Sequence, residues 1–166
     1  KFVSRPDSDY TYLRSDHVIN FARNFDRNYA YALNGGANDK AIFFGTASDD
    51  VLTVNGDRGE VAMTAGGSMS RARGFESNTA EAAEGGNDVA YIKNVLAADL
   101  IFGRSDYLNY ESRGQSSHLS GFDRISAFTE TTETGTADVD AGDYAFETVG
   151  DRRVETRPSA GRALLP

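Results

Sequence analysis

Short hydrophobic runs alternate with turn residues along the whole of this 166-residue chain. Runs rich in Val, Ile, Phe, Tyr and Ala recur about every ten residues, and Gly, Asn, Asp and Ser separate them. Runs of four to eight residues with such boundaries are typical of β-strands. The pattern predicts strands at residues 40–44, 50–54, 88–92, 99–102, 124–129 and 144–149.

One segment could instead form a helix. Residues 77–84 begin with Ser-Asn-Thr, continue with Ala and Glu, and end before a glycine, as a short capped helix would. The counterparts at 27–34 and 124–131 carry residues that favour strands, namely Tyr29, Tyr31, Ile125 and Phe128. We therefore predict strands in all three places. Their small side chains are expected in one inward column, formed by Ala30, Ala80 and Ala127.

The strand pattern repeats with a period near 49 residues. The phrase Gly-Gly-Asn-Asp-Val-Ala-Tyr-Ile at 85–92 has a counterpart at 35–42 and a degenerate one at 134–139. Further markers recur at similar spacing, for example Phe25-Asp26, Phe75-Glu76 and Phe122-Asp123. These markers define copies at 9–56, 57–105 and 106–150, followed by a tail at 151–166 that could cap one end as an extended segment or fray.

A β-solenoid is the architecture that this repeat favours. About five strands in each 49 residues fit two coils, and stacked coils bury a continuous core. We predict an all-β, right-handed parallel β-helix of about six coils over residues 1–150. The three phenylalanines at equivalent places, Phe25, Phe75 and Phe122, are expected to lie above one another in one interior row.

Composition narrows the possible partners. The net charge of -8 argues against nucleic acid, and the absence of cysteine rules out disulfides and thiolate metal sites. No stretch approaches the roughly 18 apolar residues of a membrane span. The chain begins at Lys1 with no signal peptide, so we expect a processed piece of a larger protein.

Acidic residues recur at equivalent places in the copies. The expected columns are Asp9/Asp57/Asp106, Asp26/Glu76/Asp123 and Asp39/Asp88/Asp138. Carboxylates stacked about 5 Å apart would repel each other. Calcium, arginine pairing or Asx-turns in which the carboxylate accepts backbone N–H groups could offset that repulsion. The candidate calcium ligands are Asp39, Asp50, Asp88, Asp99 and Asp138.

Catalytic signals are weak. His17 and His118 do not fall at equivalent places in the repeat, and no residue is predicted to be catalytic. Tyrosines could form a surface for sugar rings, or they could be half-buried strand residues; they are Tyr10, Tyr12, Tyr29, Tyr31, Tyr107 and Tyr110.

Two family resemblances follow from these motifs. The phrase at 85–90 resembles a fragment of the haemolysin-type calcium-binding repeat, which recurs every nine residues and has a third glycine. The whole copy is more similar to long repeats of large secreted bacterial surface proteins. That likeness is carried by Gly74-Phe75-Glu76, Gly121-Phe122-Asp123, the turn at 85–88 and Ser48-Asp49-Asp50-Val51.

The resemblance implies a parallel β-helix on an extracellular or cell-surface protein, with no catalytic residues assigned. We therefore expect a non-catalytic structural or adhesive module, which calcium could stiffen. The expected partner is a polysaccharide or another copy of the chain. One alternative is a β-helix enzyme of the lyase or epimerase type that acts on polysaccharide. Another alternative is a self-assembling coat or filament subunit.

Overall fold

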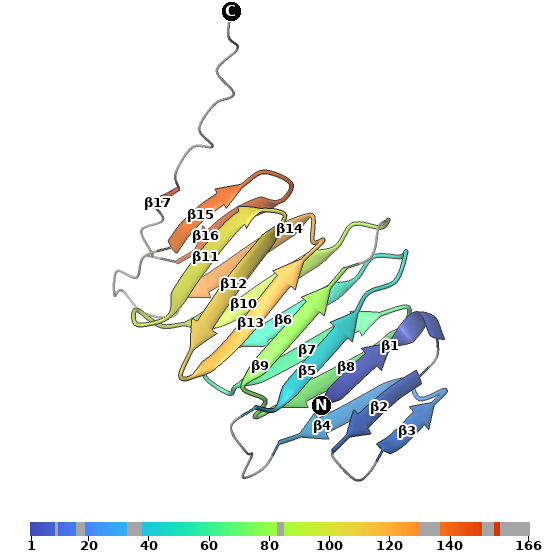
Figure 1. Ribbon diagram of the computed structural model, residues 1–166. Helices are drawn as coiled ribbons and strands as arrows, with labels where there is room; N and C mark the ends of the chain where they lie inside the picture. The colour runs from blue at the N-terminus through green and yellow to red at the C-terminus, as the bar shows by residue number, and fades with distance from the viewer. Residues whose placement is uncertain are drawn as a thin grey trace, which may run out of the picture.

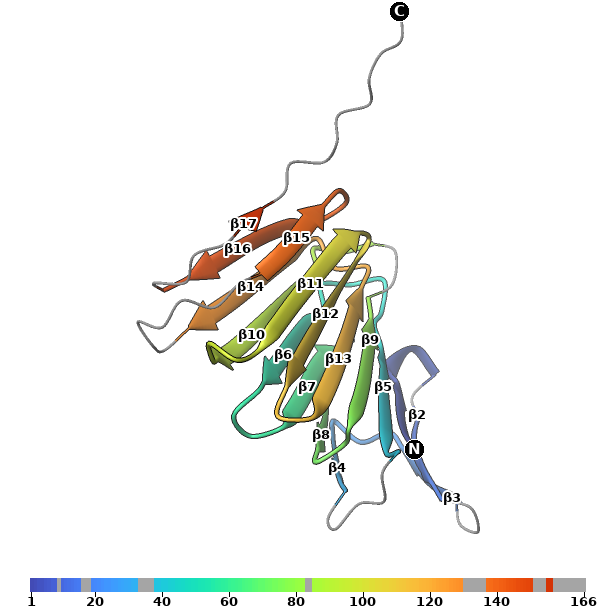
Figure 2. The same cartoon turned by 60° about the vertical axis from the view of Figure 1, so that its left-hand side comes forward.

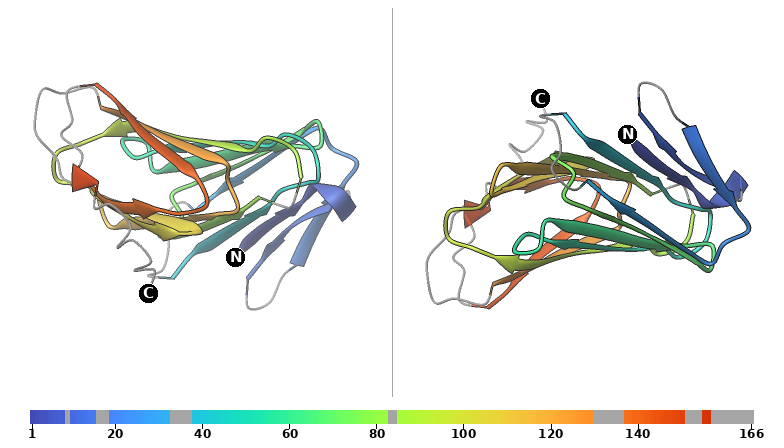
Figure 3. Two further views of the ribbon diagram at one scale, coloured as in Figure 1. Left: turned by 90° about the horizontal axis from the view of Figure 1, so that it is seen from above. Right: turned by 90° about the horizontal axis from the view of Figure 1, so that it is seen from below.

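The predicted strands form, and they assemble into two facing β-sheets (Figure 1). The computed structural model describes residues 1–8, 10–15, 19–32, 38–82, 85–129, 137–150 and 155–156. Strands account for 66% of the described residues, and the topology is a β-solenoid of about three turns, fewer than the six coils expected. Seen along the stack, the two sheets form layers on either side of the core (Figure 3).

Sheet A contains ten of the described strands, in the spatial order β17-β15-β11-β12-β13-β9-β5-β1-β2-β3. Their bounds are β1 (Phe2–Arg5), β2 (Tyr10–Arg14), β3 (Ile19–Arg23), β5 (Lys40–Phe44), β9 (Ser77–Glu81), β11 (Leu100–Ser105), β12 (Tyr107–Ser112), β13 (Gln115–Ser120), β15 (Ala137–Ala141) and β17 (Glu155–Thr156). A short 3-10 turn, η1 (Pro6–Ser8), joins β1 to β2.

Sheet B contains seven described strands, in the order β16-β14-β10-β6-β7-β8-β4. Their bounds are β4 (Arg27–Tyr31), β6 (Val51–Asn55), β7 (Glu60–Ala65), β8 (Ser68–Arg73), β10 (Val89–Val95), β14 (Arg124–Thr129) and β16 (Ala145–Val149). The segments at 27–31 and 77–81 are therefore strands, as predicted.

Each copy of the repeat supplies five strands, and successive copies exchange sheets (Figure 2). Copy one places the meander β1–β3 in sheet A, β4 in sheet B and β5 in sheet A. Copy two places the meander β6–β8 in sheet B, and copy three returns its meander β11–β13 to sheet A. The structural copies thus begin at β1, β6 and β11, a few residues before the expected starts at 9, 57 and 106.

A fourth, shortened copy closes the chain. In copy two the third strand, β8, pairs with β4 of the preceding copy. β16 pairs with β14 in the same way, so β16 occupies the position of a third strand. β17 pairs with β15 as the fourth strand β9 pairs with β5. Part of the predicted tail therefore adds a strand to one end of sheet A; the rest of 151–166 lies outside the described residues.

Neighbouring strands are closer in sequence than the repeat period. The hydrogen bond that links the start of β6 to the start of β10 joins residues 38 apart, not 49. The difference arises because the second and third strands of each copy lie on one side of its first strand, and the fifth strand of that copy lies on the other side. Within the described residues, only the middle strands β2, β7 and β12 run antiparallel to their neighbours.

The predicted interior row of phenylalanines is wrong, because equivalent residues alternate between the two sheets. Phe75 precedes β9 of sheet A and packs on Phe2, with ring centroids 6.3 Å apart. Phe122 is buried at the start of β14 in sheet B, whereas Phe25 is 60% exposed beside the edge strand β4. The alanines are buried as predicted, but Ala80 lies in the sheet opposite to Ala30 and Ala127, so they form no single column.

Apolar side chains from both sheets fill the core. Fully buried examples are Phe43 and Leu108 of sheet A and Leu52 and Ile92 of sheet B. Alternation of buried and exposed positions along these strands places every second side chain in the core. Near the β3–β4 end, serines replace apolar residues, and Ser4 Oγ donates a hydrogen bond to Ser70 Oγ across the two sheets at 2.8 Å.

A glycine corner recurs between the third and fourth strands of a copy. Gly74 and Gly121 have φ values of 80° and 76°, and a Cβ there would lie 2.5 Å from the carbonyl oxygens of Ala32 and Ala82. Both the backbone angle and the close approach require glycine. The corner in copy one has Asn24 at φ 57°, an angle that asparagine tolerates.

Replacing Ser4 and Ser70 together by cysteine tests the arrangement of the sheets. Because the two Oγ atoms are 2.8 Å apart and the chain has no native cysteine, we expect one disulfide to form between sheets A and B on oxidation. A bond that closes so long a loop should raise the free energy of unfolding by about 2–4 kcal/mol, measured by urea titration with and without reductant.

Ser4→Cys with Thr64→Cys is the matched control, because Thr64 is exposed on the outer face of β7. That pair should remain as free thiols. Equal crosslinking of both pairs, or none in Ser4→Cys/Ser70→Cys, would contradict the sheet arrangement.

Candidate functional site

Carboxylates at the strand starts of sheet B accept backbone N–H groups from neighbouring strands. Asp88 Oδ1 accepts the N–H of Asp50 at 2.8 Å, and Asp123 Oδ2 accepts the N–H of Asp88 at 2.7 Å. These residues precede β6, β10 and β14, which are adjacent in the sheet. We call this chain of contacts the carboxylate ladder, and it connects strands of copies two and three.

Sheet A contains the equivalent contact one copy earlier. Glu76 Oε2 accepts the N–H of Asp39 at 2.7 Å, just as Asp123 accepts that of Asp88. The predicted columns Asp26/Glu76/Asp123 and Asp39/Asp88/Asp138 are therefore wrong. Asp9, of the third predicted column, lies outside the described residues. The acid after the marker phenylalanine of one copy instead accepts the backbone N–H of the aspartate that follows the Gly-Gly turn of the preceding copy. Equivalent acids do not contact each other, because the exchange of sheets separates them.

Asp50 and Asp99 cap their own turns. Asp50 accepts hydrogen bonds from the backbone N–H and the hydroxyl of Thr46, at 2.7 and 3.0 Å. Asp99 Oδ2 accepts the N–H of Leu96 at 2.8 Å and the hydroxyl of Tyr110 at 2.7 Å. Of the three ways to offset acidic repulsion, acceptance of backbone N–H groups is the one that these carboxylates use.

Asp138 lies within a strand, whereas each of the other four predicted ligands directly precedes one. It belongs to β15, beside Phe102 of β11, and forms an ion pair with Arg104 at 3.2 Å. The structural counterpart of Ala41 and Ala90 is Ala137, so Asp138 does not align with Asp39 and Asp88. Asp138 is thus paired with arginine, another of the three expected ways to offset acidic repulsion.

No group of three or more acidic or histidine side chains in the described part of the chain is placed to hold a metal ion. Four acids, Glu81, Asp106, Asp123 and Asp143, do line an open groove of about 440 Å³ near β14. Calcium binding by the five predicted aspartates stays a prediction.

Burial changes the acidity of the ladder. Asp50 and Asp88 are almost fully buried, and desolvation raises the pKa of each carboxyl above its ordinary value of 3.8. Hydrogen bonds from Thr46 to Asp50, and from the Asp50 N–H to Asp88, oppose that rise. The ladder therefore balances the cost of burying charge against the donors that it satisfies.

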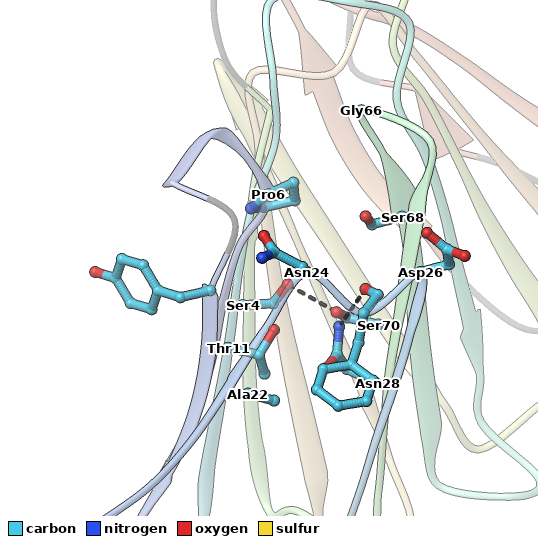
Figure 4. Close-up of a pocket in the computed structure, with 12 residues that line it drawn as sticks. Ser4, Pro6, Thr11, Ala22, Asn24, Asp26, Asn28, Gly66, Ser68 and Ser70 are labelled. Atoms are coloured by element: carbon cyan, nitrogen blue, oxygen red, sulfur yellow. Dashed lines mark hydrogen bonds between the residues drawn. The ribbon is translucent and has the colours of Figure 1, made fainter.

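A polar pocket of about 290 Å³ opens between the sheets at the β3–β4 end (Figure 4). Small hydroxyl and amide side chains line it, among them Ser4, Thr11, Asn24, Asn28 and Ser70, together with Asp26. These residues come from β1, β2, β4, β8 and the turn before β4, and only the exchange of sheets brings them together. The sequence contains no motif that would have indicated this pocket.

The outer face of sheet A carries two aromatic and arginine clusters. In the first, Tyr12 lies 6.2 Å from Tyr10 and 5.8 Å from Phe21, measured between ring centroids, and Arg5 stacks on Phe44 at 3.9 Å. The second cluster repeats that chemistry two copies later, on the same sheet. There Arg104 stacks on Phe102 at 3.9 Å, and Tyr107 lies 5.3 Å from the ring of His118.

The tyrosines of these clusters were expected from the sequence, whereas the arginines, Arg5 and Arg104, were not. Phe2-Val3-Ser4-Arg5 and Ile101-Phe102-Gly103-Arg104 match each other two periods apart, and that likeness is the signal that could have found them. Tyr10, Tyr12 and Tyr107 are half-buried, as one of the two interpretations predicted, and they also belong to an outward aromatic surface. Tyr29 and Tyr31 are instead exposed, and Tyr110 lies in the core.

The two histidines give no pair in the described structure. His118 Nδ1 lies 2.8 Å from Asn109 Oδ1 on the outer face of sheet A, and His17 lies outside the described residues. The described chain also contains no helix with the length and apolar character needed to cross a membrane.

Comparison with family models, with curated proteins and with solved structures gives no significant match to this chain. The family resemblance suggested by the motifs therefore stays a prediction.

Replacing Asp88 by alanine tests the carboxylate ladder. The substitution leaves the buried N–H of Asp50 without its acceptor, so we expect the free energy of unfolding to fall by about 1–3 kcal/mol in urea titration at neutral pH. Asp88→Asn, which keeps one carbonyl acceptor, should recover part of the loss.

Asp57→Ala is the matched control for that measurement. Asp57 is exposed and its side chain contacts Arg113 at 2.7 Å, so its loss should change stability by less than about 1 kcal/mol. Equal losses in the free energy of unfolding at positions 57 and 88 would show that the ladder stabilises the fold no more than an exposed ion pair does.

Proposed function

We propose that this chain is a non-catalytic structural and adhesive module of a secreted or cell-surface bacterial protein, and that sheet A binds an extended polysaccharide side-on. The observation that carries the proposal is the pair of aromatic and arginine clusters on one continuous outer face. A repeat fold supplies such a face naturally, because equivalent residues of copies one and three recur on the same sheet.

The chemistry of the clusters suits a sugar polymer. Aromatic rings offer apolar faces on which sugar rings can stack, and the hydroxyls of tyrosine add hydrogen-bonding groups at their edges. Arginine presents several donors in a fixed plane that can pair with the carboxylates of acidic sugars. Between the clusters lies β9, whose outward polar side chains are Thr79 and Glu81.

The spacing of the clusters favours a long ligand over a small one. Register connects Tyr12 of β2 to Val3, Ile42, Thr79 and then His118 in one row across the sheet. Four strand spacings separate the two ends of that row, or about 19 Å. A polymer that follows the row would contact both clusters, whereas a single sugar would contact one.

Rigidity of the platform supports the structural part of the proposal. The two clusters keep a constant separation only if the strands between them do not slip. Strand pairing between copies, with the contact from Asp39 to Glu76 at the start of β5 and β9, supplies that restraint. We expect the module to behave as a stiff spacer that presents its face to the polymer.

A double substitution of Tyr10 and Tyr12 by serine tests the binding face. We expect it to weaken binding to immobilised neutral and acidic polysaccharides by about tenfold or more, since each lost ring removes about 0.5–1.5 kcal/mol of stacking. Affinity electrophoresis or a glycan array gives the measurement.

Tyr29→Ser with Tyr31→Ser is the matched control, because this second Tyr-x-Tyr pair lies on β4 of sheet B. Its binding should equal that of the parent protein. Failure of the parent protein to bind any polymer, or equal losses in both variants, would sink the proposal.

Calcium stiffening is a separate proposal, supported by the number of carboxylates at the strand starts. Thermal melting in calcium, magnesium and chelator should then show a midpoint that rises with calcium alone, because an ion bound only by the folded state stabilises it. Identical midpoints in all three conditions would reject calcium as a structural component.

A further inference from the structure

We propose that the polar pocket at the β3–β4 end binds one neutral sugar ring, either as a free monosaccharide or as the terminal residue of a glycan. The site lies between the two sheets (Figure 4). Of the residues in the aromatic and arginine clusters on the outer face of sheet A, only Tyr10 also borders the pocket. Side-on binding of a polymer and end-on binding of a sugar can therefore fail separately.

Two hydroxyl groups of the pocket stand where another copy has apolar core residues. Thr11 of β2 pairs with Ser4 of β1, and their counterparts in copy two are Val61 and Val54. In copy three the counterpart of Thr11 is Leu108, which is fully buried. The fold therefore needs no hydroxyl at this position. Enclosing a hydroxyl lowers stability unless it is hydrogen-bonded, and a polar ligand in the pocket would supply the partner.

Several polar side chains of the pocket have no hydrogen-bond partner in the described part of the chain. They are the carboxylate of Asp26, the amide of Asn24 and the hydroxyls of Thr11 and Ser68. Figure 4 shows Thr11 on one side of the pocket and Asp26 and Ser68 on the other. Sugar hydroxyls both donate and accept hydrogen bonds, so they suit a site that presents donors and acceptors from two sides.

The size and charge of the pocket favour a small neutral ligand. Its volume of about 290 Å³ lies at the lower end of the range of ligand sites, which is about 300–1,000 Å³. Among the described residues that line it, Asp26 is the only charged one. An anion such as phosphate or a sugar acid would face this carboxylate with no positive side chain in the lining to offset the repulsion.

Phe25 adds an apolar surface to these polar groups. Its counterparts Phe75 and Phe122 are 2% and 3% exposed, whereas Phe25 is 60% exposed and lines the pocket. A sugar ring has polar edges and an apolar face of C–H groups, and that face can stack on an aromatic ring. The combination favours a sugar over a small molecule that is polar on every side.

Backbone contacts fix the turn that carries these groups. Asn24 has a φ of 57°, and the carbonyl oxygen of Asp26 accepts the N–H of Met69 at 2.8 Å. Asn28 Nδ2 donates a hydrogen bond to the carbonyl oxygen of Phe25 at 3.4 Å. A preformed site loses little conformational freedom when a ligand binds.

Titration calorimetry and saturation-transfer NMR of the full chain with glucose, galactose, mannose and glucuronate test the proposal. A ligand of this size makes few contacts, so we expect one neutral hexose to bind with a stoichiometry of one and a millimolar Kd. Glucuronate should bind at least about tenfold more weakly because of Asp26. The methyl glycoside of that hexose distinguishes the two sources: equal affinity assigns the site to a glycan end, and weaker affinity assigns it to the free sugar.

Absence of binding by all three hexoses, or tighter binding of glucuronate than of any hexose, would overturn the proposal.

Thr11→Val separates a binding role from a structural one, because it introduces the residue that copy two has at this place. We expect it to weaken hexose binding about tenfold and to leave the midpoint of urea unfolding unchanged or higher. Binding of long polysaccharides to the outer face of sheet A should be unaffected, since Val61 already serves the fold at the equivalent position.

Asp26→Ala removes the exposed carboxylate and should also weaken hexose binding at least about tenfold. Asp57→Ala is the matched control, because Asp57 is an exposed carboxylate outside the pocket. Parental affinity in Asp26→Ala, or an equal loss in Asp57→Ala, would show that the pocket does not hold the sugar.

Discussion

Backbone pairing between strands of different copies holds this molecule together. A copy cannot form a sheet by itself on both sides of the core, because its fourth strand lies opposite its own meander. β4 is completed by β8, and β9 is held between β5 and β13, so each copy supplies edges that only its neighbours can fill. The fold is therefore a continuous structure and not a row of separate units.

The carboxylate ladder adds hydrogen bonds to this pairing at the starts of the strands. A parallel strand enters the sheet from a turn, and the N–H groups of that turn have no partner in the backbone hydrogen bonding of the sheet. Asp88 and Asp123 accept those groups from the next strand, and Glu76 does so in sheet A. Carboxylates are strong acceptors, so the gain in hydrogen bonding offsets the cost of burying charge near other charges.

Two kinds of surface differ in such a fold: the outer faces, which recur from copy to copy, and the two ends of the stack, which do not. The outer face of sheet A repeats every second copy, and that places Arg5 and Arg104 at equivalent positions on one face, each stacked on a phenylalanine ring. The ends do not repeat, and they carry the exposed aromatic side chains of β3 and β4 and the acids of β15 and β16. The repeated outer face and the two ends are thus separate surfaces of the same repeat.

The sequence by itself determined the strands, the period and the solenoid class. Alternating runs bounded by glycine and aspartate specify strands locally, as at 40–44 and 124–129, and equivalent markers such as Gly74 and Gly121 reveal the repeat. Those features depend only on near neighbours in the chain. What the tertiary structure decided was which copies face each other, and hence that Phe25, Phe75 and Phe122 do not share a row and that Asp26, Glu76 and Asp123 form no single column. The physical reason is that a half-turn between copies leaves the hydrophobic alternation of every strand unchanged, so residue pattern alone cannot distinguish stacking in one column from exchange between two sheets.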